Sequence, residues 1–481
     1  MLAIFQRAWF SVLLLPIADS APSPSNVVYP RLLESRGLDV EKILYIQDDI
    51  VLRLQKTSIL SEGVVFSENI DGTRVDKIMS GKKLEENMYH DKDRMASVNV
   101  EDKNGGVEVK GILSDTLRIT PLHLSARSDG GPIPHKIFKV EQRAFFDIIT
   151  MLPFTVIQEK IYTGKTFYAE LKIVADVNHR RAFEKDENLV QYLALCMKLV
   201  NIRYEDTSDP RVQFLLTSVE VAEEGFQEEF VAYDVECPRA SQKTYMDPVK
   251  MIEKAKQRYG SGEEDITVFI TSLDLADNFD GVVYNHVMGQ AKFGGLCSDG
   301  SRVAIVEDAP PTYSLIQIIA HELAHTLGAG HDGGKPFHKI AGMVKQNCSD
   351  STGHLMAPSA HGENHGHFSS CSIEQINAFV STLTQSCLDV KLETYHKVIA
   401  SELPGKNMNR TYYCQMKHKN YPRIISDMEG FYMRRCKVMC CADGIYPCFE
   451  EPAVDGMSCG NNKVCFRHRC VDPPNLFAMS P

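Results

Sequence analysis

Residues 321–332 of the chain read His-Glu-Leu-Ala-His-Thr-Leu-Gly-Ala-Gly-His-Asp, which is the pattern H-E-x-x-H-x-x-G-x-x-H. On a helix, His321 and His325 lie four residues apart, so both imidazoles project from one face. Glu322 lies about 100° further around that helix. Its carboxylate is therefore expected to reach a water molecule beside a metal ion rather than the ion itself.

The end of the same stretch supplies a third nitrogen. Gly328 permits a sharp backbone turn that a side chain would resist, and this turn is expected to bring His331 back toward the two helical histidines. Three protein ligands leave one tetrahedral position open, which is typical of a catalytic zinc site rather than a structural one. The alternative is a chance match on an amphipathic helix, and the fixed spacing of Gly328 and His331 argues against it.

The stretch resembles the zinc site of the metzincin proteases. Asp332, directly after the third histidine, is similar to the reprolysin (adamalysin) branch of that group. Residues 355–358 (Leu-Met-Ala-Pro) are similar to the Met-turn of these enzymes, where Met356 would form a hydrophobic floor under the metal without ligating it. The alternative for Met356 is an ordinary core methionine.

This resemblance implies a zinc metalloendopeptidase with one catalytic Zn²⁺. His321, His325 and His331 would be the metal ligands, and zinc would activate a water molecule for attack on the peptide carbonyl. Glu322 would take the proton of that water as general base and return it to the leaving amine. The expected substrates are proteins or peptides, among them extracellular matrix or plasma proteins.

Length and composition indicate a multidomain globular protein. The chain has 481 residues, so two to four domains are expected. Apolar residues make up 43% and charged residues 24%, which are globular values. The formal net charge of −11 argues against nucleic-acid binding and favours a soluble protein. The chain is expected to be a monomer.

The N-terminus predicts secretion. Residues 1–20 have the organisation of a signal peptide, with Arg7 before a short apolar run and with the small residues Ala18 and Ser20 before a cleavage site. The alternative is a buried N-terminal helix. No later stretch has the 18 or more apolar residues of a membrane span. An extracellular location is therefore predicted.

Residues 21–163 are predicted to form a β-rich prodomain. They contain no cysteine and include alternating stretches such as residues 107–113. Residues 111–136 are similar to reprolysin propeptides, which often carry a free cysteine that occupies the zinc. Because this segment has none, latency is expected to use another group or simple steric cover. The alternative is an independent β-rich binding domain.

Residues 164–390 are predicted to form the catalytic domain. The pattern is β-α-β-α-β, and the resemblance implies an α/β metzincin fold with a twisted, mixed, five-stranded sheet and helices packed on it. Asp247 and Pro248 open one helix, which Gly260 closes. A capping box at residues 372–375 opens the last helix. Expected strands cover residues 167–177, 212–221, 266–270 and 302–306, and the zinc helix covers residues 312–327.

Residues 289–297 match the exposed edge strand of the family in spacing. An extended substrate is expected to pair with this edge through the backbone of Ala291 and Phe293. The alternative is a plain sheet edge. The resemblance also implies a Ca²⁺ site, for which Glu170 and Asp274 match two positions, whereas Val390 stands where an amide side chain is expected.

The fourteen cysteines fall into two even blocks, six at residues 196–387 and eight at residues 414–470. Even blocks favour disulfides closed within each domain in an oxidising compartment, although six cysteines allow 15 pairings. The resemblance implies that Cys297 pairs with Cys387, Cys348 with Cys371, and Cys196 with Cys237.

Two features of the C-terminal half have open interpretations. His354, His361, His365 and His367 form a histidine-rich loop, for which a second metal site and a solvated loop are the alternatives. Residues 391–481 are predicted to form a cysteine-rich domain, similar to modules that follow reprolysin domains in arthropod (tick) salivary metalloproteases. Asn409 begins a predicted glycosylation sequon. The rival functional hypothesis is a secreted binding protein that acts on a host or matrix partner through this domain.

Overall fold

The computed structural model describes most of the chain between residues 27 and 472. The described residues are 27–34, 42–70, 73–103, 106–122, 131–140, 146–150, 166–232, 242–279, 282–285, 287–334, 348–358, 360, 362–390, 409–418, 421, 423–426, 432–442, 448–453, 457–460, 462–466 and 469–472. The chain divides into two compact units, residues 1–390 and 391–481. The predicted signal peptide and the predicted boundary at residue 164 lie outside the described residues.

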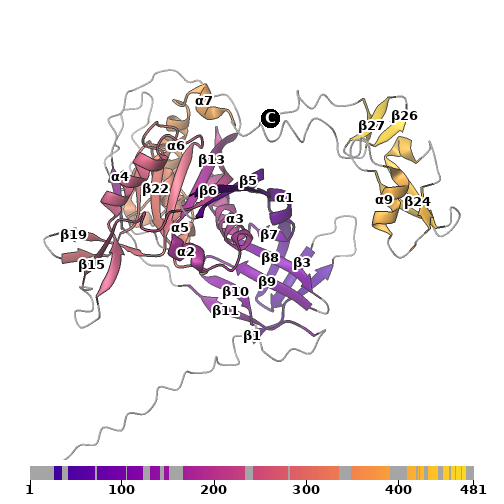
Figure 1. Ribbon diagram of the computed structural model, residues 1–481, viewed down its shortest axis with the longest axis horizontal. Helices are drawn as coiled ribbons and strands as arrows, with labels where there is room; N and C mark the ends of the chain where they lie inside the picture. Colours follow the sequence, from indigo (N-terminus) through magenta and orange to yellow (C-terminus); the bar gives the residue numbers. More distant parts are fainter. Residues whose placement is uncertain are drawn as a thin grey trace, which may run out of the picture. The chain divides into compact units, whose positions relative to one another are not determined.

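An eight-stranded mixed sheet forms the centre of the first unit, in the order β12-β21-β22-β17-β13-β14-β5-β6 (Figure 1). The five middle strands from β21 to β14 are the five expected for the catalytic domain. They run parallel except β21, which is antiparallel to β22. Their bounds are β13 (Thr166–Ala175), β14 (Arg211–Val221), β17 (Ile266–Thr271), β21 (Val287–Lys292) and β22 (Val303–Glu307).

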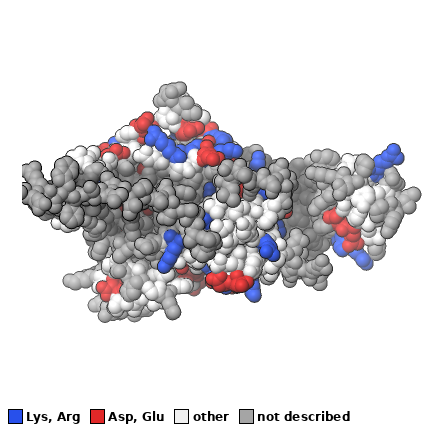
Figure 2. Space-filling model, turned by 90° about the horizontal axis from the view of Figure 1, so that it is seen from below, with Lys and Arg blue, Asp and Glu red and all other residues white. Residues whose placement is uncertain are grey.

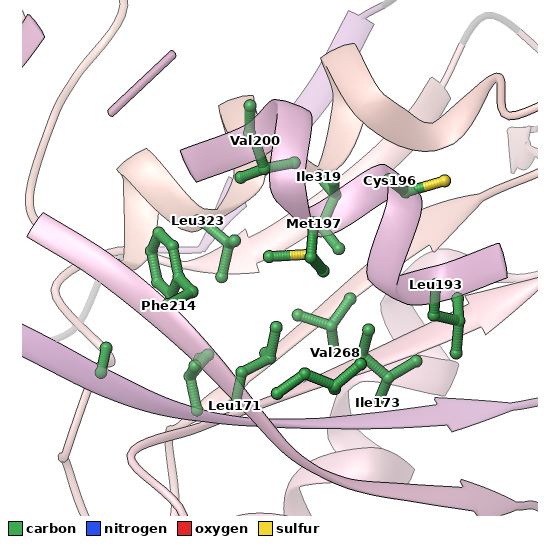
Figure 3. Close-up of a cluster of buried hydrophobic side chains, with 14 of the residues drawn as sticks. Leu171, Ile173, Leu193, Cys196, Met197, Val200, Phe214, Val268, Ile319 and Leu323 are labelled. Atoms are coloured by element: carbon green, nitrogen blue, oxygen red, sulfur yellow. The ribbon is translucent and has the colours of Figure 1, made fainter. Parts of the chain in front are cut away.

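The sequence of the inner strands explains why helices cover both faces of the sheet. All six residues of β17 are buried, as expected for a parallel strand covered on each side. Val268 and Ile270 point into a core shared with α3 (Asp186–Arg203) and α5 (Leu315–Thr326), whereas Phe269 points into a second core with α4 (Pro248–Tyr259). Figure 3 shows Met197, Ile319 and Leu323 meeting above the first of these faces.

The N-terminal cap of α4 is the one predicted from the sequence, whereas the cap of α6 is not. The side chain of Asp247 accepts a hydrogen bond from the backbone N–H of Lys250, and Gly260 ends α4, as predicted. The predicted cap of the last helix is wrong by three residues. Helix α6 (Ser370–Val380) is capped by Ser369, whose side chain accepts from the N–H of Ser372, so Ser372 lies inside the helix.

Residues upstream of 164 extend the central sheet at both ends. Strand β12 (Phe146–Thr150) pairs with β21, and the hairpin of β5 (Leu60–Ile70) and β6 (Thr73–Ser80) continues beyond β14. The sheet therefore exceeds the five strands predicted from residues 164–390. The reason is that open backbone groups at both edges are paired by strands from earlier in the chain.

The same upstream part also builds a nine-stranded antiparallel sheet, in the order β1-β11-β10-β9-β8-β7-β4-β3-β2. Met88 and Ile112 of this sheet share the buried cluster of Leu193, so α3 packs between the two sheets (Figure 1). The strands are β1 (Val27–Val28), β2 (Arg31–Glu34), β3 (Lys42–Gln47), β4 (Ile50–Lys56), β7 (Met88–Asp91), β8 (Ala96–Lys103), β9 (Gly106–Ile112), β10 (Leu117–Pro121) and β11 (His135–Lys139).

The remaining elements of the first unit are short. They are α1 (Gly81–Leu84), α2 (Val177–Arg181), η2 (Tyr204–Asp206), η3 (Asp350–Thr352), η4 (Gly362–Asn364), α7 (Gln385–Leu388), β15 (Glu229–Ala232), β16 (Lys243–Met246), β18 (Asp274–Leu275), β19 (Asp277–Phe279) and β20 (Val282–Tyr284). Among the described helices, none is both long enough and apolar enough to cross a bilayer.

The second unit is held together by disulfides around a small core. They join Cys414 to Cys440, Cys436 to Cys465, Cys441 to Cys448, and Cys459 to Cys470. Its elements are α9 (Arg410–Lys417), η5 (Met433–Arg435), β23 (Ile424–Ile425), β24 (Lys437–Ala442), β25 (Cys448–Pro452), β26 (Ser458–Gly460), β27 (Lys463–Phe466) and β28 (Arg469–Val471). On the face shown in Figure 2, described basic and acidic side chains lie beside one another.

Candidate metal centre

Helix α5 carries the first two histidines of the motif into the protein interior. His321 and His325 are buried, and their Nε2 atoms lie 3.0 Å apart. The helix is buried on nearly every side, which its run of Leu, Ile and Ala permits. The two rings therefore have fixed positions on one face, as their spacing predicted.

The third histidine is returned by a turn at Gly328. This residue has φ +80°, and a Cβ atom added there would lie 3.1 Å from Cβ of Phe379. Glycine is required on both grounds, because a side chain would meet Phe379 and the left-handed backbone disfavours other residues. The turn places Nε2 of His331 3.2 Å from Nε2 of His321.

Backbone carbonyls orient two of the three rings. Nδ1 of His321 donates to the carbonyl of Leu355 at 2.8 Å, and Nδ1 of His325 donates to the carbonyl of Ala329 at 2.7 Å. A neutral imidazole that donates through Nδ1 presents an unprotonated Nε2 on its other side. Burial lowers the pKa of His325 to about 4, so this ring is neutral at pH 7.

Helix α6 fixes the loop that carries the third histidine. Ser369 donates through its hydroxyl to the carboxylate of Asp332 at 2.6 Å, and Gln375 accepts from the backbone N–H of Gly330 at 2.8 Å. Burial raises the pKa of the Asp332 carboxyl, and the Ser369 hydrogen bond opposes that rise. Sequence reasoning missed Ser369 and Gln375, since neither belongs to the motif. Both lie well after the motif in the chain, so no local signal links them to it.

The methionine of the predicted Met-turn is joined to this loop by a backbone hydrogen bond. Met356 is fully buried, and its carbonyl accepts a hydrogen bond from the N–H of Asp332 at 2.9 Å. Its neighbour Leu355 supplies the carbonyl that orients His321. This segment therefore positions the histidines through its backbone, in addition to filling the core with the methionine side chain.

The structure places a fourth side chain among the histidines that sequence reasoning did not identify. Asp147 of β12 lies with Oδ2 2.6 Å from Nε2 of His325 and Oδ1 2.7 Å from Nε2 of His331. Its side chain is 3% exposed. Burial opposes ionisation of Asp147, but the three imidazoles hold its pKa well below its usual range. Nothing in the local sequence singles this aspartate out.

These four groups fit a zinc ion. Zn–N distances of about 2.0–2.1 Å in a tetrahedron place neighbouring ligand atoms about 3.3 Å apart, close to the observed separations of the Nε2 atoms. The donor chemistry also requires a cation. The Nε2 atoms of His325 and His331 lie within 2.7 Å of the Asp147 carboxylate, whose Oδ2 has no hydrogen-bond partner. A divalent cation between them satisfies both kinds of donor atom.

Glu322 lies beside this centre without ligating it. Both of its carboxylate oxygens are buried and have no hydrogen-bond partner. Burial raises the pKa of Glu322 well above its usual value, and the charge of Asp147 raises it further. Gly289 of β21 makes room for this carboxylate, because a Cβ atom there would lie 2.7 Å from Cδ of Glu322.

The predicted substrate edge is the strand β21, which ends at Lys292. Ala291 lies within the strand and pairs with Ala304, whereas Phe293 lies just beyond its end. The outer side of β21 is paired with β12, with Ile149 opposite Ala291. This edge is therefore covered by β12.

Two expected disulfides are present in the structure, and the third is not. Cys297 is bonded to Cys387, and Cys348 to Cys371. The pairing of Cys196 with Cys237 is wrong, because Cys196 is a free thiol buried on α3 against the core (Figure 3). Cys196 packs in this apolar core, and Cys237 lies outside the described residues.

Some other predicted site residues are not brought together. Asp274 forms an ion pair with Lys243, and the residue beside Glu170 is instead Asp265, whose carboxylate accepts from the Glu170 N–H at 2.9 Å. Val390 is partly buried at the end of the first unit. Calcium binding remains a prediction.

The described histidines of the loop after residue 353 point to separate partners. His354 contacts Thr352 at 2.9 Å, while His365 and His367 lie near Asp115 and Asp206. Position 361 lies outside the described residues. Asn409 is exposed, and its glycosylation remains a prediction.

Comparison with known proteins supports the assignment. Residues 166–369 match the family model of metallopeptidase family M12 (reprolysin type), and residues 404–471 match that of ADAMTS cysteine-rich domain 2. The chain is 25% identical to the venom metalloproteinase BumaMPs1 of Olivierus martensii, over 72% of this chain and 88% of that protein. It is 24% identical to the venom metalloproteinase antarease TserMP_A of Tityus serrulatus, over 79% and 97%.

A third relative is much longer than this chain. It is a disintegrin and metalloproteinase with thrombospondin motifs 18 of Mus musculus, 30% identical over 38% of this chain and 14% of that protein.

The fold and the centre thus define a zinc metalloendopeptidase. More particularly, the chain has a metallopeptidase domain of family M12, reprolysin type, followed by an ADAMTS cysteine-rich domain.

Proposed function

We propose that this chain is a secreted endopeptidase in which His321, His325 and His331 hold the catalytic zinc and Glu322 is the general base. The observation that carries this proposal is the arrangement of the four side chains. Three Nε2 atoms converge on one point, and an unpaired, buried carboxylate lies beside that point. A purely structural metal site needs no such carboxylate.

Each residue has a distinct task in this reaction. When bound, zinc lowers the pKa of a coordinated water and polarises the scissile carbonyl. Glu322 accepts the proton of the attacking water and returns it to the nitrogen of the departing amine. Its burial among apolar residues keeps bulk water from competing for that proton. Leu355 and Ala329 hold the rings of His321 and His325 so that their Nε2 atoms stay aimed at one point.

The substrate is proposed to be an extended segment of an extracellular protein. Strand β21 packs against α5. Among the strands that residues after 164 contribute to the central sheet, it lies at the edge next to β12. Once β12 has left, the main chain at Ala291 has free hydrogen-bonding groups along its outer side. An extended peptide pairs with such an edge while its side chains enter neighbouring pockets.

Secretion is supported by the cysteines of the described residues. Six disulfides join them, four in the second unit alone. Disulfides at this density persist in oxidising compartments and are rare in the cytosol. The predicted signal peptide at residues 1–20 leads to the same proposal.

The test is the substitution Glu322→Gln in the activated enzyme. Glutamine keeps the shape of the side chain but cannot accept the proton, so kcat for a peptide substrate should fall by about 10²–10⁴-fold. Zinc content measured by mass spectrometry should stay at the wild-type level, because Glu322 is not a ligand. Glu224→Gln, on an exposed carboxylate, is the matched control. Near-normal turnover by Glu322→Gln would remove this residue from the role of base.

A further inference from the structure

Strand β12 brings the end of the upstream segment to the metal centre. Asp147 and the three histidines offer four ligand atoms that all lie within 4.8 Å of one another. The strand itself runs parallel to β21, with Asp147 opposite Gly289 and Thr150 opposite Lys292. One short segment therefore occupies both the open position of the metal and the edge where a substrate would pair.

We propose that Asp147 keeps the uncleaved chain latent by acting as the fourth ligand of the zinc. This inference rests on the proposed function of the three histidines. A carboxylate oxygen is a normal zinc ligand at about 2.0–2.2 Å, so aspartate can complete the tetrahedron that three imidazoles leave open. Residues 21–163 contain no cysteine, and no thiolate from that segment competes for the position.

At this position, Asp147 also protects its own segment from hydrolysis. Its carboxylate lies 2.6 and 2.7 Å from two histidine nitrogens and is almost fully enclosed. The catalytic water needs the same coordination position. While Asp147 holds it, Glu322 has no water from which to take a proton.

Gly289 makes this arrangement possible. It faces Asp147 across the strand pair and has no side chain to separate β12 from Glu322. The carboxylates of Asp147 and Glu322 are thereby brought to the same enclosed centre, where a cation relieves their repulsion. The bound metal and the inhibitory aspartate therefore stabilise each other in the uncleaved chain.

The rest of the upstream part is held by contacts that do not involve Asp147. Arg118 of β10 donates to the carbonyls of Thr312 and Tyr313 at 2.8 and 3.3 Å, just before α5. Strand β5 pairs with β14 at the opposite end of the sheet. Replacing Asp147 should thus free the metal without unfolding this part or detaching it.

The experiment uses the full-length chain loaded with Co²⁺ in place of zinc. Acetohydroxamic acid is titrated while the visible spectrum of the cobalt is recorded. This probe is small enough to report on the fourth metal position rather than on access to the whole edge. The variants are Asp147→Ala and Asp147→Asn, and the matched control is Asp102→Ala, on an exposed aspartate of β8.

The wild type and Asp102→Ala should show little spectral change with the probe. Asp147→Ala should have a different starting spectrum and bind acetohydroxamic acid at least ten times more tightly. Asp147→Asn, which is nearly identical in shape to the wild type, should bind acetohydroxamic acid with an intermediate affinity. It takes the place of Asp147→Ala in the test if the alanine variant does not fold. Equal titrations of wild type and both Asp147 variants would overturn the proposal in favour of steric cover alone.

Metal content separates this inference from the function on which it rests. If folded wild-type protein binds neither Co²⁺ nor Zn²⁺, the assignment of the three histidines has failed. If metal binds normally but Asp147 variants behave like the wild type, only the role of Asp147 has failed.

Discussion

The substitution Gly289→Ala should impair catalysis by displacing the general base. An alanine Cβ at this position would lie 2.7 Å from Cδ and 2.8 Å from Cγ of Glu322. Non-bonded carbon atoms are most stable about 3.5–4.0 Å apart, so the Glu322 side chain or strand β21 must shift by about 1 Å. Displacements of about 1 Å in an active site can lower rates by about 100-fold. We expect kcat/KM to fall by about that factor, equivalent to about 2.7 kcal/mol of transition-state stabilisation.

The assay is peptide hydrolysis by the activated enzyme, combined with zinc analysis of the same preparation. Zinc content should not change, because Gly289 does not contact the three Nε2 atoms. The matched control is Gly366→Ala, where an added Cβ atom meets nothing within 4 Å and the backbone is not left-handed. Activity of Gly289→Ala within threefold of the wild type would refute the reasoning. It would mean that Glu322 can move at no cost, or that its observed position is not the catalytic one.

Two further predictions concern buried groups outside the centre. Cys196 is a buried thiol whose pKa burial raises well above its usual value, so iodoacetamide should label it only after unfolding. Peptide mass mapping that finds it in a disulfide with Cys237 would contradict this. Burial, aided by Lys198, lowers the pKa of His90 to about 4. In the unfolded chain this ring takes up a proton below about pH 6.5. The contribution of His90 to the free energy of unfolding should therefore fall between pH 6.5 and 4, by about 2 kcal/mol from pH 7 to pH 5. Guanidinium titrations should show a smaller loss for His90→Gln, and an equal loss would exclude His90 as the cause.

Several local features could be read from the sequence because local physics decides them. The spacing of His321 and His325 sets their common face on any helix, and Gly328 marks the turn that returns the third ring. The cap at Asp247 and the buried strand β17 likewise follow from residue types in a short window. The capping-box pattern predicted Ser372 as the cap of α6, because Gln375 follows it by three residues, whereas Ser369 has no Glu or Gln at that spacing. Only the structure shows that Ser369 accepts the hydrogen bond.

The motif by itself determined the chemistry of the centre, since two imidazoles and a carboxylate at helical spacing, with a third imidazole after a glycine turn, suit one kind of metal site. Tertiary structure decided which other groups reach it. Asp147 lies 174 positions before His321 in the chain and meets it only because β12 pairs with β21. The free state of Cys196 and the carbonyls that orient the rings are likewise set by packing. Strand pairing and side-chain packing join residues that are remote in sequence, and no periodicity within a short window encodes such contacts.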